Sequence, residues 1–77
     1  MHLYEILLGV DRAARDSGRR MTMTVCERDP LSAAIAAEGM ADRELRSPVE
    51  YSHAMQVKCL RRGVAAKPLA SLVPAAA

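Results

Sequence analysis

The stretch that most constrains the fold of this chain is VEYSHAMQVKCL, from Val49 to Leu60. Its odd-numbered positions are mostly apolar, and most of its even-numbered positions are polar. Strict alternation over this length is typical of a strand with one face on a core and the other toward water. We therefore expect residues 49–60 to form the longest strand of a small antiparallel sheet, with Tyr51, Met55 and Val57 facing the core.

Two further strands are predicted near the N-terminus. Residues His2–Val10 and Arg20–Glu27 both alternate, and the second is rich in residues with high β-propensity. The sequence between them, DRAARDSGR at 11–19, is polar and contains an Asp-Ser-Gly turn signal at 16–18. We expect residues 11–19 to form a long hairpin loop.

A helix is predicted between the second and third strands. Asp29 can cap the free N–H groups at its start, and Pro30 is tolerated at the first helical position. The segment Leu31–Leu45 is rich in good helix formers, and Ser47-Pro48 ends it. Its expected core-facing stripe consists of Leu31, Ala34, Ile35, Ala41 and Leu45.

This element order predicts an α+β fold of the β-β-α-β type. A helical crossover from the second strand places the third strand beside the first, so the sheet order is 2-1-3 with the helix on one face. Residues 64–67 are expected to add a short fourth strand, so that one domain spans 1–67 and a loosely ordered C-terminal tail spans 68–77. The strand residues expected in the core are Tyr4, Ile6, Leu8, Val10, Met21, Met23, Val25, Tyr51, Met55 and Val57.

Size and charge narrow the function classes. A chain of 77 residues buries a small core, which leaves little volume for a substrate pocket. The net charge of +2 is modest for a dedicated nucleic-acid binder, although residues 51–77 carry four basic side chains and no acid. The sequence shows no signal-peptide pattern and no bilayer-spanning apolar stretch, so we expect a cytoplasmic protein with reduced thiols.

The residue types that support catalysis or metal binding are scattered. His2, His53, Cys26 and Cys59 do not form a C-x-x-C or H-x-x-x-H spacing, and the glycines do not form a phosphate-binding loop. The helix carboxylates are expected on its solvated side. We therefore expect no enzyme activity, no catalytic residue, no metal site and no cofactor.

Two arginine clusters are the remaining candidates for a binding site. Arginine is favoured at protein interfaces and at phosphates alike. Because the sheet is antiparallel, the two clusters are expected at opposite ends of it. The expected partner-binding residues are Arg12, Arg15, Arg19 and Arg20 in the hairpin loop and Arg61 and Arg62 after the third strand. With Tyr4 and Tyr51 expected to point inward, the open sheet face would lack the aromatic side chains that stack on single-stranded RNA.

In architecture the chain resembles the anti-CRISPR proteins, which are small phage-encoded inhibitors. The resemblance covers LYEILLGV, MTMTVCE, DPLSAAIAAEGMADREL and VEYSHAMQVKCL, and it lies in the size, the element order and the arginine clusters. It implies a protein that binds a CRISPR effector complex and blocks target-DNA recognition. No functional residue is carried over, because that class has no shared sequence signature.

Three functions follow as hypotheses. The first is a non-enzymatic protein-binding module that acts on a nucleic-acid-handling complex, with an anti-CRISPR inhibitor as its specific form. The second is weakly specific nucleic-acid binding through the same arginines, which a steep loss of affinity with salt would reveal. The third is a homo-oligomer formed through exposed strand edges.

Overall fold

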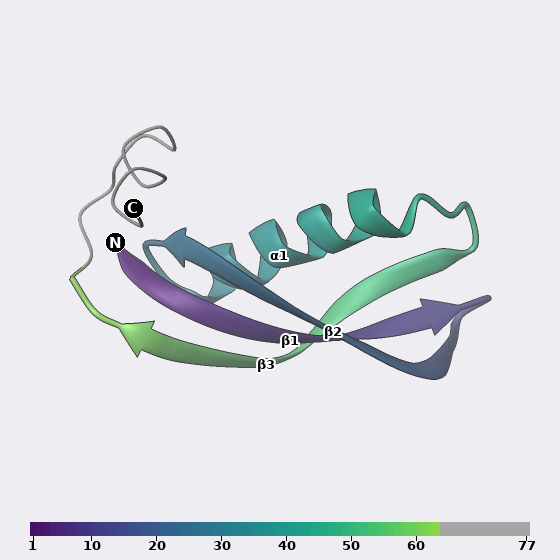
Figure 1. Cartoon of the computed structure of the whole chain (residues 1–77), viewed down its shortest axis with the longest axis horizontal. Helices are drawn as coiled ribbons and strands as arrows, with labels where there is room; N and C mark the ends of the chain where they lie inside the picture. Colours follow the sequence, from purple (N-terminus) through teal and green to yellow (C-terminus); the bar gives the residue numbers. More distant parts are fainter. Residues whose placement is uncertain (64–77) are drawn as a thin grey trace, which may run out of the picture.

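The computed structural model describes residues 1–63, which form three strands and one helix (Figure 1). These are β1 (His2–Arg12), β2 (Arg15–Glu27), α1 (Pro30–Leu45) and β3 (Glu50–Arg61). All strand pairs are antiparallel, and the sheet order is β2-β1-β3. With α1 packed on one face, the predicted α+β fold and its 2-1-3 order are confirmed. The expected fourth strand and tail lie outside the described residues.

The prediction of a long hairpin loop over residues 11–19 is wrong. β1 and β2 continue to Arg12 and Arg15, so the turn consists only of Ala13 and Ala14. Their φ angles are 50° and 64°, and two positive values in a two-residue hairpin are the type I′ combination. This turn normally carries Asn or Gly, so the alanines concealed it from sequence analysis.

The Asp-Ser-Gly signal marks a bulge in β2 and not the hairpin turn. The β1–β2 register shifts between Gly9 and Asp11, where Gly18 adopts a φ of 81°. Gly18 N donates to Asp16 Oδ1 at 2.9 Å, and Ser17 Oγ donates to Val10 O at 2.7 Å. The local turn chemistry was correctly recognised, but the strand resumes on both sides of it.

α1 begins and ends where the sequence predicts. Asp29 Oδ1 accepts from Ser32 N at 2.7 Å, Pro30 occupies the first turn, and Arg46 ends the helix with a φ of 50°. The residues fully buried against the sheet are Ala33, Ala37 and Ala41, all 0% exposed. Their small size lets the helix backbone lie close to the strands.

The predicted helix stripe is therefore mostly wrong. Leu31 and Ile35 are 71% and 61% exposed, so they lie on the outer side of α1. Of the expected stripe only Ala41 is buried. Within the described part of the chain, α1 does not have the length and apolarity needed to cross a membrane.

The strand part of the core is confirmed for β1 and only partly for β3. The buried strand residues are Tyr4, Ile6, Leu8, Val10 and Val25, with Met21, Met23 and Val57 partly buried beside them. Tyr51 and Met55, by contrast, are 57% and 48% exposed. Their predicted inward orientation is wrong.

A bulge in β3 explains this error. Leu8 pairs with Ala54 but Leu7 pairs with Gln56, so Met55 is an extra residue in the ladder. The register shifts again between Leu3 and Tyr4. An extra residue in a strand moves the side chains on its N-terminal side to the opposite face of the sheet. Tyr51 therefore lies on the open face, away from α1.

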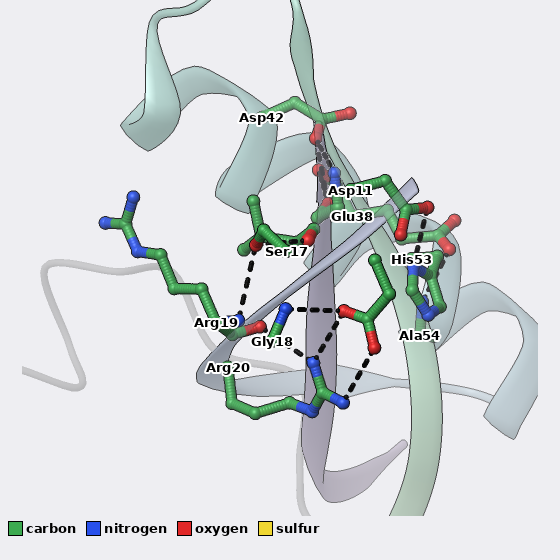
Figure 2. A network of polar contacts seen from close by, with 12 residues as sticks. Asp11, Ser17, Gly18, Arg19, Arg20, Glu38, Asp42, His53 and Ala54 are labelled. Carbon is green, nitrogen blue, oxygen red and sulfur yellow. Dashed lines mark hydrogen bonds and ion pairs between the residues drawn. The ribbon is translucent and has the colours of Figure 1, made fainter. Parts of the chain in front are cut away.

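Side chains of α1 cover part of the outer edge of β3 (Figure 2). Asp42 Oδ1 accepts from Ser52 N at 2.7 Å, and Glu38 Oε2 accepts from Ala54 N at 2.8 Å. Ser52 Oγ also lies 2.8 Å from Asp42 Oδ1. These bonds fix the helix to β3 and satisfy backbone donors that an edge strand leaves free.

Candidate functional site

One end of the molecule, which we call the hairpin end, brings together the β1–β2 turn, the C-terminus of α1 and the start of β3 (Figure 1). Ala13 N donates to Val49 O at 3.1 Å, which ties the turn to the segment between α1 and β3. Arg12 pairs with Glu50 in the β1–β3 register. The hairpin end is therefore a defined surface and not a loose loop.

Arg12 and Arg15 face each other directly across the turn. Both are exposed, and among residues 1–63 neither forms an ion pair with a carboxylate. Although Glu50 lies beside Arg12 in the register, its carboxylate is 3.9 Å from Arg19 Nη1. Two like charges in directly opposite positions destabilise an antiparallel pair.

Arg20 is engaged within the fold, in contrast to Arg12 and Arg15. Its Nη1 and Nη2 atoms donate to the two Asp16 carboxylate oxygens at 3.0 and 3.1 Å (Figure 2). These bonds, together with the Gly18 N–H, lower the pKa of Asp16 to about 2. The bond to Asp16 raises the pKa of Arg20 in turn. Because this fork is occupied, Arg20 is a weaker candidate for partner binding.

Two arginines that the sequence analysis did not select also lie at the hairpin end. Arg43 is in the last turn of α1, and Arg46 caps it, its N–H donating to Asp42 O at 3.3 Å. Both line an open groove of about 350 Å³ beside β2. The sequence held a signal for the position of Arg43 and Arg46. Because the chain after the predicted helix enters the third strand beside the first, the end of the helix must lie close to Arg12.

Arg61 and Arg62 lie at the other end of the sheet. Arg61 pairs with Leu3, whereas Arg12 pairs with Arg15. Nine residue steps along β1 separate these pairs, or roughly 30 Å at about 3.3 Å per residue. The expectation that the two clusters do not merge is confirmed.

A polar cluster on the open face of the sheet was missed. His53 Nδ1 lies 3.0 Å from Asp11 Oδ2, a close polar contact on the open face (Figure 2). The imidazole lies over Gly9. The sequence did not predict that His53 and Asp11 lie together. The bulge at Met55 changes the face on which His53 lies, and Asp11 was expected in a loop and not in a strand.

In the part of the chain that the structure describes, the side chains that could bind a metal ion do not cluster. Residues 1–63 contain no group of three or more His, Cys, Asp or Glu side chains that could hold a metal ion. Cys26 and Cys59 are free and partly exposed, and the register places Cys26 opposite Leu3 and Cys59 opposite Tyr4, on opposite faces of the sheet.

Comparison of the chain with protein-family models, with curated proteins and with solved structures found no match in any of the three.

Proposed function

We propose that this chain is a non-enzymatic protein-binding domain whose hairpin end contacts its partner. The observation that carries the proposal is the pair Arg12 and Arg15, which are exposed, directly opposite each other and without an ion-pair partner in the described chain. An acidic partner surface would relieve their mutual repulsion. Arginine suits this role because its planar fork binds carboxylates in bidentate fashion.

The conformation of the turn supports the same surface. Ala13 and Ala14 both have positive φ, which costs a non-glycine residue about 1–2 kcal/mol. Strained backbone of this kind concentrates at binding and active sites. Alanine also gives a narrow tip, so a partner can approach the backbone closely while the arginines reach around it.

The specific form of the proposal is a cytoplasmic phage inhibitor of the anti-CRISPR type. In that form the arginines of the hairpin end contact acidic groups of a CRISPR effector complex or occupy its nucleic-acid path. The architectural resemblance supports this form. Arg43 and Arg46 add two basic side chains at the groove beside β2, which Glu44 also lines.

Direct nucleic-acid binding is the second candidate, and one observation favours it. Tyr51 lies 57% exposed on the open face, where sequence analysis had expected no aromatic side chain. It pairs with Asp11 near the hairpin end. A single tyrosine provides one stacking platform, and Asp11 opposite it places negative charge beside it, which opposes phosphate binding.

A pull-down from nuclease-treated bacterial lysate tests the proposal. The baits are the wild-type chain, the double variant Arg12→Ala/Arg15→Ala and the matched control Arg61→Ala/Arg62→Ala, which removes the same charge from the opposite end. We expect a stoichiometric protein complex with the wild type and the control, and at least a tenfold loss with R12A/R15A.

Two results would contradict this expectation. Equal capture by all three baits would exclude the hairpin end as the binding surface. Recovery of nucleic acid alone, without nuclease and with affinity that falls steeply with salt, would replace protein binding by direct nucleic-acid binding. Purified CRISPR effector complex, assayed for target-DNA binding with and without the chain, tests the specific form.

A further inference from the structure

The two edges of the sheet differ in how they are protected. On β3, the carboxylates of Glu38 and Asp42 accept the outward N–H groups of Ala54 and Ser52. β2 is the other edge, and no element within residues 1–63 covers its outer side. A long edge strand without such protection is a template for pairing with another chain.

The register identifies the outward-facing groups of β2. Val10 O is directed toward β2, where it accepts from Ser17 Oγ. Because backbone groups alternate in direction along an antiparallel ladder, β1 residues 4, 6 and 8 also face β2, where their partners are Val25, Met23 and Met21. The N–H and C=O groups that point outward are then those of Arg20, Thr22, Thr24 and Cys26.

The sequence of β2 is complementary to itself in one antiparallel register. With a two-fold axis at Met23, Thr22 of one copy faces Thr24 of the other, and Met21 faces Val25. The same register places Arg19 opposite Glu27, once on each side of the axis. Shifting the axis to Thr22 or Thr24 loses this charge pair, because Arg19 then faces Val25 or Met21 faces Glu27.

The groove beside β2 fits the same arrangement. It has a volume of about 350 Å³, its lining includes Met23 and Met40, and Met40 is 37% exposed. Met23 of a second copy would meet Met23 at the axis, over this groove. Methionine packs well in such irregular spaces.

We propose that two copies of this chain pair through β2, antiparallel about Met23, to form a continuous six-stranded sheet with both helices on one face. The partner is a second copy because the strand complements itself in sequence. The assembly closes at two copies because Glu38 and Asp42 block the β3 edge beside Ser52 and Ala54, which hinders head-to-tail growth. The proposed dimer shares the groove beside β2 with the surface proposed for the partner, but it rests on the edge residues of β2 and not on Arg12 and Arg15.

Disulfide trapping tests the register. In a Cys26→Ser/Cys59→Ser background, Met23→Cys would bring two Cα atoms to about 4.5 Å across the axis, within disulfide range. Under mild oxidation we expect M23C to become mostly covalent dimer of twice 8.4 kDa. The matched single variants Thr22→Cys and Thr24→Cys should remain mostly monomeric. In this register residue 22 of one copy faces residue 24 of the other, so a single cysteine at either position has a threonine opposite it. Dominant trapping through T22C or T24C would overturn the Met23 register.

Sedimentation of the unmodified chain tests the assembly itself. We expect a concentration-dependent mass between 8.4 kDa and twice that value. Thr24→Pro, which removes one outward N–H, should shift the protein to monomer, whereas the matched control Thr24→Val should not. A wild-type monomer at all concentrations, or unchanged association in a folded T24P variant, would overturn the proposal. If T24P does not fold, the cysteine series still decides the outcome.

Discussion

The imidazole of His53 occupies the space directly above Gly9, so that a Cβ on Gly9 would lie 2.7 Å from His53 Cε1. The two residues are paired across the β1–β3 ladder. Gly9 is thus required for a close approach of its neighbour and not for an unusual backbone angle. The contact holds the imidazole beside Asp11.

Gly9→Ala should destabilise the protein by roughly 1 kcal/mol, because the partly exposed ring must turn away from its place over Gly9. Chemical denaturation measures the change. The double variant Gly9→Ala/His53→Ala provides the control: removing the ring removes the two closest contacts and leaves only Met55 Sδ at 3.0 Å, so the cost of G9A should fall in that background. An equal cost of G9A with and without His53 would contradict the account.

The N-cap of α1 predicts a second stability effect. Asp29→Ala removes the acceptor of the Ser32 N–H bond and should cost about 1 kcal/mol. Asp29→Asn keeps a good capping side chain, so thermal unfolding should show a much smaller loss for D29N than for D29A. Similar losses for the two variants would mean that the charge and not the cap supplies the stability.

The strained turn predicts a stabilising substitution. Ala13→Asn/Ala14→Gly provides the residues that a type I′ turn prefers, and it should raise the free energy of unfolding by about 1 kcal/mol. The gain is smaller than the full strain because glycine also increases the entropy of the unfolded chain. Denaturant titration against the wild type measures it, and a loss of stability would contradict the assigned turn.

The ion pair between Asp16 and Arg20 predicts a pH dependence. The pKa of Asp16 is lowered from 3.8 to about 2 in the folded protein. Its contribution to stability is therefore fully present above pH 3.8 and is lost as pH falls toward 2. Asp16→Asn should flatten the decline of stability in this window, as measured by urea unfolding at several pH values. An unchanged slope in D16N would contradict the pairing.

The element order and the sheet order were predictable from sequence because they rest on long periodic patterns. The alternation in the three strands and the Asp29-Pro30 helix start are strong local signals. The right-handed crossover then leaves one arrangement for the third strand. No tertiary information was needed for these features.

Sequence periodicity failed where the ladder is irregular. One extra residue, Met55, reversed the facing of Tyr51, and the Asp16–Gly18 bulge resembled a loop. The predicted core-facing stripe of the helix was wrong for another reason. A hydrophobicity pattern favours large apolar residues such as Leu31 and Ile35, whereas close packing of the helix on the sheet buries the small Ala33 and Ala37. Of the candidate site, the separation of the two arginine clusters was predictable, whereas the placement of Arg12, Arg15, Arg19 and Arg20 in a loop was wrong, because all four lie in β1 and β2. Recognising that Arg43 and Arg46 lie at the hairpin end required the positions of both the β1–β2 turn and the end of α1.

The most direct test of the proposed function is amide hydrogen exchange of the chain alone and bound to the protein that it captures. We expect new protection to be concentrated in residues 11–16 and 43–49, the segments that form the hairpin end. A matched measurement on the complex of R61A/R62A should show the same pattern. Protection concentrated instead around Arg61–Gly63, or none at the hairpin end, would contradict the claim that Arg12 and Arg15 face the partner.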